Sequence, residues 1–425
     1  MNKDLAIGLD VGTSGVRCAA LDARGETIAI AKRRFIETGA NPRDPVAWAK
    51  LADEALVALL ATINRDAVRA IAVDGTSGTM LAVDQVGDPV APPLMYDDPV
   101  ADAAVLDRVA AGAPDDSAAH GATSGLAKAL VLQDAKGIAR LLHQADWITA
   151  RLSGVWDVSD ENNALKTGYD PIARRWGDWI AETGLRTDLL PRVVPAGMAI
   201  APITPAAAAR LGLPDAVQVV AGTTDGCASF LATGASEIGD AVTALGSSLT
   251  LKILSDRPIF SPVHGIYSHR IGNSWLAGGA SNTGGKVLAS YFDGERLAAL
   301  SNRIDPRRNA RLDYYPLLAV GERFPAADPA MRPRLSPRPA DDADFLHELL
   351  AGIAAIEAQG YACLTGLGGP PLRSVRSVGG GARNPQWTVM RERLLRAPFL
   401  PVRSTEAAAG AARLALRGLR EGVPA

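Results

Sequence analysis

The feature that most constrains the fold is the opening stretch, in which an apolar strand runs into an acidic residue and a turn of glycines and hydroxyls. Residues 6–17 read Ala-Ile-Gly-Leu-Asp-Val-Gly-Thr-Ser-Gly-Val-Arg, and a second apolar strand follows. Glycines let backbone N–H groups approach a phosphate closely, and the hydroxyls of Thr13 and Ser14 add donors. Asp10, at the end of the strand, is placed to hold a hydrated Mg²⁺. Taken alone, the stretch is explained equally well as an ordinary hairpin turn.

Two later segments repeat this pattern and give the first one its weight. The apolar strand 217–221 ends in Gly222-Thr223-Thr224-Asp225-Gly226, and a helix of small residues follows. The strand 241–245 ends in Gly246-Ser247-Ser248, and 249–254 returns as its partner. Two strand–turn–strand halves predict a duplicated α/β architecture with a nucleotide in the cleft between the halves.

The remaining segments predict mixed secondary structure around these motifs. A helix is expected over 45–62, and residues 101–212 are expected to be mostly helical. The stretch 323–342, rich in proline and arginine, is interpreted as an ordered surface loop rather than a flexible linker. An amphipathic helix is expected over 344–367, and an alanine-rich helix over 406–419 is expected to pack back against a sheet.

Length and composition indicate two domains and a small-molecule function. A chain of 425 residues exceeds one hydrophobic core. Its net charge of −2 gives no general attraction to nucleic acid or anionic membrane. Three cysteines lie far apart without metal-like spacing, which suits a reducing compartment. We find no signal peptide pattern and no apolar run long enough to span a bilayer, so a cytoplasmic location is expected.

The motifs together offer the parts that phosphoryl transfer needs: a phosphate cradle, a metal-side carboxylate and a base for the acceptor hydroxyl. The turns at 12–15 and 246–248 are candidates for the cradle, and Asp10 is the candidate carboxylate. Asp225, between a strand and a helix, is the candidate general base. The competing interpretation of Asp225 is a helix N-cap, a common use of aspartate at such a position.

Two further motifs have both a structural and a functional interpretation. The stretch 74–79, Asp-Gly-Thr-Ser-Gly-Thr, is either hairpin chemistry or a segment in which Ser77 and Thr79 present hydroxyls to a polyol. The triplet Gly379-Gly380-Gly381 is either a strand–helix turn or a place where backbone approaches an adenine ring. The five histidines are scattered, and each is interpreted as structural or exposed.

In this order along the chain, the motifs resemble those of the FGGY carbohydrate kinases, which share the fold of actin, hexokinase and the heat-shock chaperone ATPases. The resemblance covers essentially the whole chain. The motifs that carry it are Gly8-Leu9-Asp10-Val11-Gly12-Thr13-Ser14, the segments 221–226 and 246–248, Gly278-Gly279 with Asn282 and Gly284-Gly285, the segment 379–385, and the helical landmarks 144–147 and 159–164.

The resemblance implies an enzyme that uses ATP and Mg²⁺ to phosphorylate a sugar or polyol hydroxyl. Asp225 matches the catalytic base, and Asp10 matches the acidic residue near metal and substrate, so Asp10 and Asp225 are the expected metal-side residues. The ATP-binding residues that it implies are Gly12, Thr13, Ser14, Gly246, Ser247, Ser248, Gly285, Gly380, Gly381, Asn384 and Trp387, of which Gly380, Asn384 and Trp387 match the adenosine side.

The acceptor sugar is inferred from the stretch 74–79. Typical D-xylulokinases carry Gln-Met-His-Gly there, and this chain does not. Its Asp-x-Thr-Ser-x-Thr form resembles the short D-ribulose kinases of cyanobacteria and plants. The resemblance places a ketopentose near Asp10, Ser77, Thr79, Asp97 and Asp225. Where other members have Trp-x-Asp/Asn, this chain has a tyrosine two residues before Asp98.

We therefore predict two RNase H-like domains of the actin/hexokinase ATPase type, over 1–230 on the sugar side and 231–425 on the ATP side, with the last helix packing back on the first. The predicted reaction is ATP-dependent phosphorylation of D-ribulose to D-ribulose 5-phosphate. The alternatives are D-xylulose, another ketose or a polyol as acceptor, or a nucleotide-binding switch without catalysis. The expected partners are sugar and ATP, with no nucleic acid or membrane, in a monomer or homodimer.

Overall fold

The computed structural model describes residues 4–421, which form two compact units. Unit 1 contains the described residues up to Gly234, together with His269–Gly272 and the segment from Arg403 onward. Unit 2 contains Ala235–Ser268 and Asn273–Val402. The domain boundary expected between residues 230 and 231 falls inside helix α7 (Asp225–Ala232) of unit 1.

Unit 1 is built on a six-stranded mixed sheet. In spatial order its strands are β11 (Ala199–Pro202), β12 (Gln218–Thr224), β4 (Val68–Gly75), β1 (Leu5–Gly12), β2 (Gly15–Asp22) and β3 (Thr27–Arg34). β1, β2 and β3 form an antiparallel meander, and β4 and β12 run parallel to β1. The carboxyl ends of β1, β4 and β12 therefore meet at one edge of the sheet.

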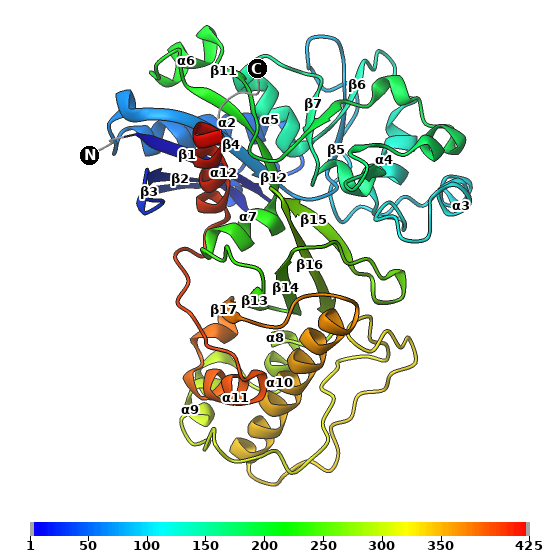
Figure 1. Ribbon diagram of the computed structural model, residues 1–425, viewed down its shortest axis with the longest axis vertical. Coiled ribbons are helices and arrows are strands. Elements are labelled where there is room, and N and C mark those ends of the chain that lie inside the picture. Colours follow the sequence, from blue (N-terminus) through cyan, green and yellow to red (C-terminus); the bar gives the residue numbers. More distant parts are fainter. Residues whose placement is uncertain (1–3, 422–425) are drawn as a thin grey trace. The chain divides into compact units, whose positions relative to one another are not determined.

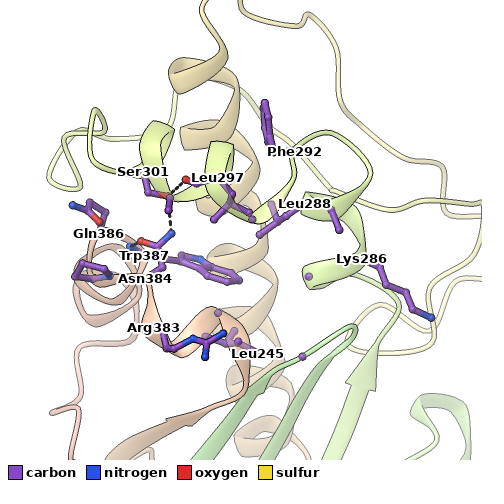
Figure 2. Close-up of a pocket in the computed structure, with 18 of the residues that line it drawn as sticks. Leu245, Lys286, Leu288, Phe292, Leu297, Ser301, Arg383, Asn384, Gln386 and Trp387 are labelled. Atoms are coloured by element: carbon purple, nitrogen blue, oxygen red, sulfur yellow. Dashed lines mark hydrogen bonds between the residues drawn. The ribbon is translucent and has the colours of Figure 1, made fainter.

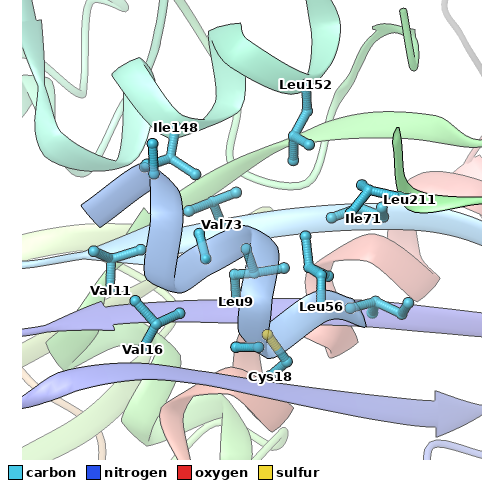
Figure 3. Packing of buried hydrophobic residues seen from close by; sticks show 14 of the residues in the cluster. Leu9, Val11, Val16, Cys18, Leu56, Ile71, Val73, Ile148, Leu152 and Leu211 are labelled. Atoms are coloured by element: carbon cyan, nitrogen blue, oxygen red, sulfur yellow. The ribbon is translucent and has the colours of Figure 1, made fainter. Parts of the chain in front are cut away.

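One face of this sheet carries the large apolar side chains. Ile7, Leu9 and Val11 alternate along β1, and Ile71 and Val73 do the same on β4. They pack against three helices, as Figure 3 shows for part of the cluster: α2 (Pro45–Leu60), α5 (Gln144–Ser153) and α6 (Pro205–Leu211).

The opposite face carries small side chains, and this allows helices to approach the sheet closely. Ala6 and Gly8 on β1 and Ala70 and Ala72 on β4 face the alanines of α12 (Ala407–Glu421). A Cβ at Gly8 would lie 2.0 Å from the carbonyl oxygen of Ala408, so only glycine fits there. Figure 1 shows α12, in red, beside these strands.

Residues 101–212 are not mostly helical, so that expectation is wrong. This part of unit 1 mixes short helices, 3-10 turns and two-stranded ladders. Its elements include α3 (Ala103–Gly112), α4 (Gly125–Leu132), β6 (Arg140–His143), β7 (Val158–Asp160), β8 (Tyr169–Asp170), β9 (Arg175–Trp176) and β10 (Arg192–Val194), and β6 pairs with the earlier strand β5 (Met80–Val83). Strands of two to four residues are too short to leave a periodic signal in the sequence.

Four strands of the unit 2 sheet repeat the arrangement of β1, β2, β3 and β4 in unit 1. β13 (Asp240–Leu245), β14 (Leu249–Ser255) and β16 (Ser274–Ser281) form an antiparallel meander, and β17 (Ser374–Val378) runs parallel to β13. The strand order of this sheet is β15-β16-β14-β13-β17, and β15 (Tyr267–Ile271) includes residues from the ranges given above for both units. This repeat confirms the duplicated α/β architecture. The helices of unit 2 are α8 (Gly285–Ala289), α9 (Gly294–Ser301), α10 (Asp342–Gly366) and α11 (Pro385–Leu395).

Helix α10 is the one described helix whose length and apolar composition would suffice to cross a membrane, which corrects the expectation that no such segment exists. Its apolar side chains, among them Phe345, Leu349 and Ile353, form the core of unit 2. Its Glu357 makes a buried ion pair with Arg391 of α11, at 2.6 Å. The composition of α10 is thus accounted for by packing inside the unit.

Candidate active site

A row of polar side chains crosses the unit 1 sheet where the small-residue face reaches the strand ends. Asp10 follows Ala6 and Gly8 on β1, and Asp74 follows Ala70 and Ala72 on β4. Asp10 is in register with Asp74 on one side and with Arg17 of β2 on the other. Neighbouring strands lie about 4.8 Å apart, so the two carboxyl groups lie side by side.

Arg17 and burial act in opposite directions on Asp10. The Arg17 guanidinium lies 3.2 Å from the Asp10 carboxylate, and Arg17 is held in turn by Glu406 at 3.4 Å. Burial is the largest influence and raises the pKa of Asp10, with a further contribution from the charge of Asp225, whereas Arg17 lowers it. The pairing with Arg17 therefore keeps a negative charge accessible at a site that disfavours it.

Asp74 is the more strongly perturbed of the pair. It is completely buried, and burial raises its pKa well above the usual range, with the charges of Asp10 and Asp225 adding to the effect. Neither of its carboxyl oxygens accepts a hydrogen bond from any donor in the described part of the chain. Asp74 therefore favours the protonated form, which can donate to Asp10.

Asp225 stands at the start of α7, directly after the end of β12. Thr224 is the N-cap of this helix, and its hydroxyl accepts from the Cys227 amide at 3.4 Å. The N-cap interpretation of Asp225 is therefore wrong, because its neighbour fills that position. Asp225 is in the first helical turn, where the helix dipole favours a negative charge, and its charge acts on both Asp10 and Asp74.

The stretch 74–79 is not a hairpin, since β4 pairs with β1 and β12 while β5 pairs with β6. Thr79 does not present its hydroxyl to an open site. The group is buried, lies 2.6 Å from the Thr76 hydroxyl and accepts from the Tyr96 amide at 2.9 Å. The Ser77 hydroxyl is buried and has no hydrogen-bond partner among the described residues.

The segment 95–98 is held by Asp98 rather than by Asp97. The Asp98 carboxylate accepts from the Met95 amide at 2.7 Å and pairs with Arg43, which lowers the pKa of Asp98. Asp97 is exposed, and so is the Tyr96 side chain. The predicted sugar contact at Asp97 is thus on a solvent-facing part of this segment.

The remaining predicted residues of unit 1 form the turn between β1 and β2. Gly12 and Gly15 close the hairpin ladder around Thr13 and Ser14, both of which are exposed. Gly15 has φ of +152°, and a Cβ there would lie 2.1 Å from a carbonyl oxygen of β3. The turn thus presents its hydroxyls and amides to solvent.

Unit 2 contains a cavity of about 760 Å³, within the usual size range of ligand pockets. Its apolar walls include Leu288, Leu297 and Trp387, and Figure 2 shows the two leucines directed toward the indole. The Trp387 indole is fixed by a hydrogen bond to the Leu350 carbonyl at 3.0 Å. This is a flat, rigid wall suited to a planar ring.

Most of the predicted ATP-binding residues of unit 2 line this cavity. They are Gly246, Ser247, Gly285, Gly380, Gly381, Asn384 and Trp387. Ser248 does not line it. The Asn384 side chain is used within the protein, because it caps α11 at the Trp387 amide, 3.0 Å away, and donates to Ser301 at 2.8 Å. Asn384 therefore shapes the cavity wall (Figure 2).

Two residues of these sites were missed by the sequence analysis. Asp74 was assigned to turn chemistry, and only the register of β1 and β4 brings it beside Asp10. Lys286 lines the unit 2 cavity, and Figure 2 shows its side chain extending away from Trp387. The signal that could have indicated it is the Gly284-Gly285-Lys286 stretch after a predicted strand, since lysine after a glycine turn is a common phosphate contact.

Comparison with known proteins identifies the family. A model described as the C-terminal domain of the FGGY family of carbohydrate kinases matches residues 241–419, and the N-terminal domain model matches residues 131–232. The chain belongs to the FGGY family of carbohydrate kinases. It is thereby an ATP-dependent sugar phosphotransferase with the two-domain fold of the actin and hexokinase ATPases.

Individual relatives of this FGGY kinase have low sequence identity to it, but they match it over most of its length. The xylulose kinase of Bacillus subtilis is 24% identical over 97% of this chain and 88% of its own, and that of Escherichia coli is 24% identical over 90% and 83%. A solved structure described as a xyloylose kinase from Brucella ovis superimposes with a TM-score of 0.85 at 23% identity, over 98% of this chain and 91% of its own.

Proposed function

We propose that this FGGY kinase transfers the γ-phosphoryl group of ATP to the terminal hydroxyl of D-ribulose, giving D-ribulose 5-phosphate. The observation that carries the proposal is the Ser77 hydroxyl, buried without a partner among the described residues, in the stretch that begins with Asp74. A buried hydroxyl without a partner is costly unless a ligand satisfies it. The Asp-x-Thr-Ser-x-Thr form of this stretch resembles the short D-ribulose kinases.

In this reaction the residues of unit 1 handle the acceptor sugar. Asp225 accepts the proton of the terminal hydroxyl of the sugar. The oxygen of that hydroxyl forms the bond to the γ-phosphorus as the bond to ADP breaks and ADP leaves. Arg17 keeps Asp10 in place and favours its charged form. Ser77 binds a hydroxyl of the sugar. Asp74 in its protonated form removes the repulsion that a second buried charge beside Asp10 would cause.

The carboxylates also fit a magnesium ion. Mg²⁺ is usually bound through one or two carboxylates, with water and substrate phosphates completing its shell. No group of three or more side chains that could hold a metal ion is gathered within the described residues. Asp10 and Asp225 would hold the ion. When bound, it neutralises charge on the transferring phosphate.

Unit 2 supplies the nucleotide site in this proposal. The Trp387 wall and the leucines suit the adenine base, and the absence of side chains at Gly380 and Gly381 leaves room for it beside the backbone. The Gly246-Ser247 turn and Lys286 line the same cavity and supply polar groups for phosphate oxygens.

D-xylulose is the second candidate acceptor, because the xylulose kinases among the relatives match along nearly the whole chain. The two sugars differ only in the configuration at C3. Discrimination between them therefore depends on one hydroxyl group, and a residue that binds that hydroxyl decides the preference.

The test is an ADP-release assay with MgATP and each acceptor separately. The panel is D-ribulose, D-xylulose, L-ribulose, L-xylulose, glycerol, erythritol, D-gluconate and no acceptor. The proposal predicts the highest kcat/KM with D-ribulose. The highest kcat/KM with D-xylulose would replace D-ribulose by the second candidate. ADP release that no acceptor increases would instead favour a nucleotide-binding switch.

A further inference from the structure

Lys128 is a buried lysine that none of the steps above uses. It lies in α4, its side chain has no exposed surface, and it is among the largest fully buried side chains of the protein. Its neighbours in the helix, Leu126 and Leu130, belong to an apolar cluster of unit 1. Lysine is rarely fully buried, since removing its charge from water is costly. A leucine or methionine would fill this position at lower cost.

The Lys128 ammonium group joins two segments that are far apart in the sequence. It donates to the carbonyl oxygen of Gly78 at 2.8 Å and to that of Met95 at 2.6 Å. We call residues 76–79 the serine turn and residues 95–98 the tyrosine segment. Both contain predicted sugar contacts, Ser77 in the first and Asp97 in the second. Lys128 therefore connects the two places where unit 1 is expected to touch the sugar.

The surroundings of Lys128 make it a connector rather than one half of an ion pair. Burial lowers the pKa of Lys128 to about 8, and Lys166 acts in the same direction, while Asp97 and Asp98 raise it. The ammonium group donates both of these hydrogen bonds to backbone carbonyls and not to a carboxylate. Backbone acceptors fix the path of the chain directly, because moving either segment breaks the bond.

The other hydrogen bonds between the serine turn and the tyrosine segment involve residues that follow Gly78. The Tyr96 amide donates to the Thr79 hydroxyl, and Met80 and Leu94 exchange two backbone bonds just beyond. Within the described chain, Lys128 is the side chain that ties the carbonyl between Ser77 and Thr79 to the tyrosine segment. Gly78 has φ of +89°, and because glycine has no Cβ the backbone at this position is conformationally permissive.

We propose that Lys128 is a positioning residue for the sugar, which sets the spacing between the serine turn and the tyrosine segment and thereby the affinity for the acceptor. This rests on the proposed function, in which those segments bind the sugar. Lys128 touches neither substrate, because its side chain is fully covered. Its effect is on sugar binding and leaves the nucleotide site of unit 2 unaffected.

The test compares Lys128→Met with the matched control Gln133→Leu. Gln133 caps the same helix and also makes two bonds to distant backbone, with Gly184 at 3.2 Å and Arg186 at 2.9 Å, away from the predicted sugar contacts. For Lys128→Met we expect kcat/KM for the accepted sugar to fall about 10- to 100-fold, with a raised KM for the sugar, since misplacement by about 1 Å can cost that much, while KM for ATP changes less than about twofold. Gln133→Leu should leave both KM values near those of the wild type.

A second readout does not depend on activity. Hydrogen–deuterium exchange should show faster exchange in peptides that cover both the serine turn and the tyrosine segment in Lys128→Met, with the rest of unit 1 unchanged. If no sugar of the panel is phosphorylated by the wild type, the proposed function fails, and this exchange experiment still decides whether Lys128 joins the segments. Unchanged exchange in both segments, or an unchanged KM for the sugar, would overturn the proposal. Equal losses in sugar and ATP parameters would also overturn it.

Discussion

The two sheets share a core of four strands in the same arrangement but carry different side chains at matching positions. Asp10 stands two residues before the glycine of the β1–β2 turn and is in register with Asp74. In unit 2, Ala244 stands two residues before Gly246 and is in register with Val378. The same backbone framework therefore presents a carboxyl pair in unit 1 and an apolar pair in unit 2. The framework fixes where a site forms, and two side chains decide what kind of site it is.

The two units are therefore suited to different ligands. Unit 1 gathers carboxyls and a buried hydroxyl, which suit proton transfer and a polyhydroxylated ligand. Unit 2 gathers leucines and an indole, which suit a planar base. Gly380→Leu and Ser77→Ala below should therefore each raise KM for one substrate and leave KM for the other unchanged.

The largest effect is expected from Asp225→Asn. Loss of the base should lower kcat about 10²- to 10⁴-fold, because general-base catalysis contributes that much. ATP affinity, measured by calorimetry without added Mg²⁺, should stay near the wild-type value, since the nucleotide cavity lies in unit 2. A melting temperature equal to that of the wild type would show that the variant is folded. Full kcat in this variant would refute the assignment of Asp225 as base.

Gly380→Leu tests unit 2 in the same way. A Cβ at Gly380 meets nothing within 4 Å, so the protein accommodates the substitution and the added side chain fills the cavity. KM for ATP should rise by at least roughly 10- to 100-fold, because a single methylene in a fitted pocket is worth about that much and leucine adds a larger group, with KM for the sugar unchanged. Gly366→Leu, also in open space but at the end of α10, is the control and should behave as wild type.

Ser77→Ala should have a smaller effect, confined to the sugar. Loss of one hydrogen bond of about 0.5–1.5 kcal/mol raises KM for the sugar roughly 2- to 10-fold, with KM for ATP unchanged. The control is Ser255→Ala, which removes another buried serine hydroxyl, in unit 2. That hydroxyl accepts a hydrogen bond from the Arg257 amide at 3.2 Å. Equal sugar KM values for the wild type and Ser77→Ala would remove Ser77 from the sugar site.

The smallest effect is a change in the pH dependence of stability in Asp74→Asn. The folded protein raises the pKa of Asp74, so the stability contributed by its protonated form is present at low pH and is lost as pH rises through the folded value. Asparagine keeps the neutral state. The variant should therefore melt about 2–4 °C higher than the wild type at pH 8, the shift that about 1 kcal/mol produces, with a smaller difference at pH 5.

The control for this measurement is the exposed turn residue in Asp215→Asn, which should follow the wild type at both pH values. The contradicting outcome is a wild type that gains melting temperature relative to Asp74→Asn when the pH rises from 5 to 8. In that case Asp74 would not be protonated in the folded protein.

Features that depend on a few adjacent residues were predictable from the sequence. The glycine–hydroxyl turns, the strands that lead into them and the position of Asp225 between strand and helix are local patterns, because backbone turns demand particular residues at fixed spacing. The cavity-lining glycines 246, 380 and 381 were found in this way. The alanine-rich final helix was also expected to pack on a sheet, since small residues permit close approach.

Features that depend on register and on distant segments were decided only by the tertiary structure. Asp-Gly at 74–75 is typical of a hairpin, and nothing local shows that β4 lies beside β1 with Asp74 next to Asp10. Thr79 was expected to face a ligand, but its hydroxyl accepts a hydrogen bond from the amide of Tyr96, 17 positions further along the chain. Lys128 stands in an apolar helix without any motif. Its role comes from two carbonyls that folding brings to it, and burial of that lysine becomes possible only once they are in place.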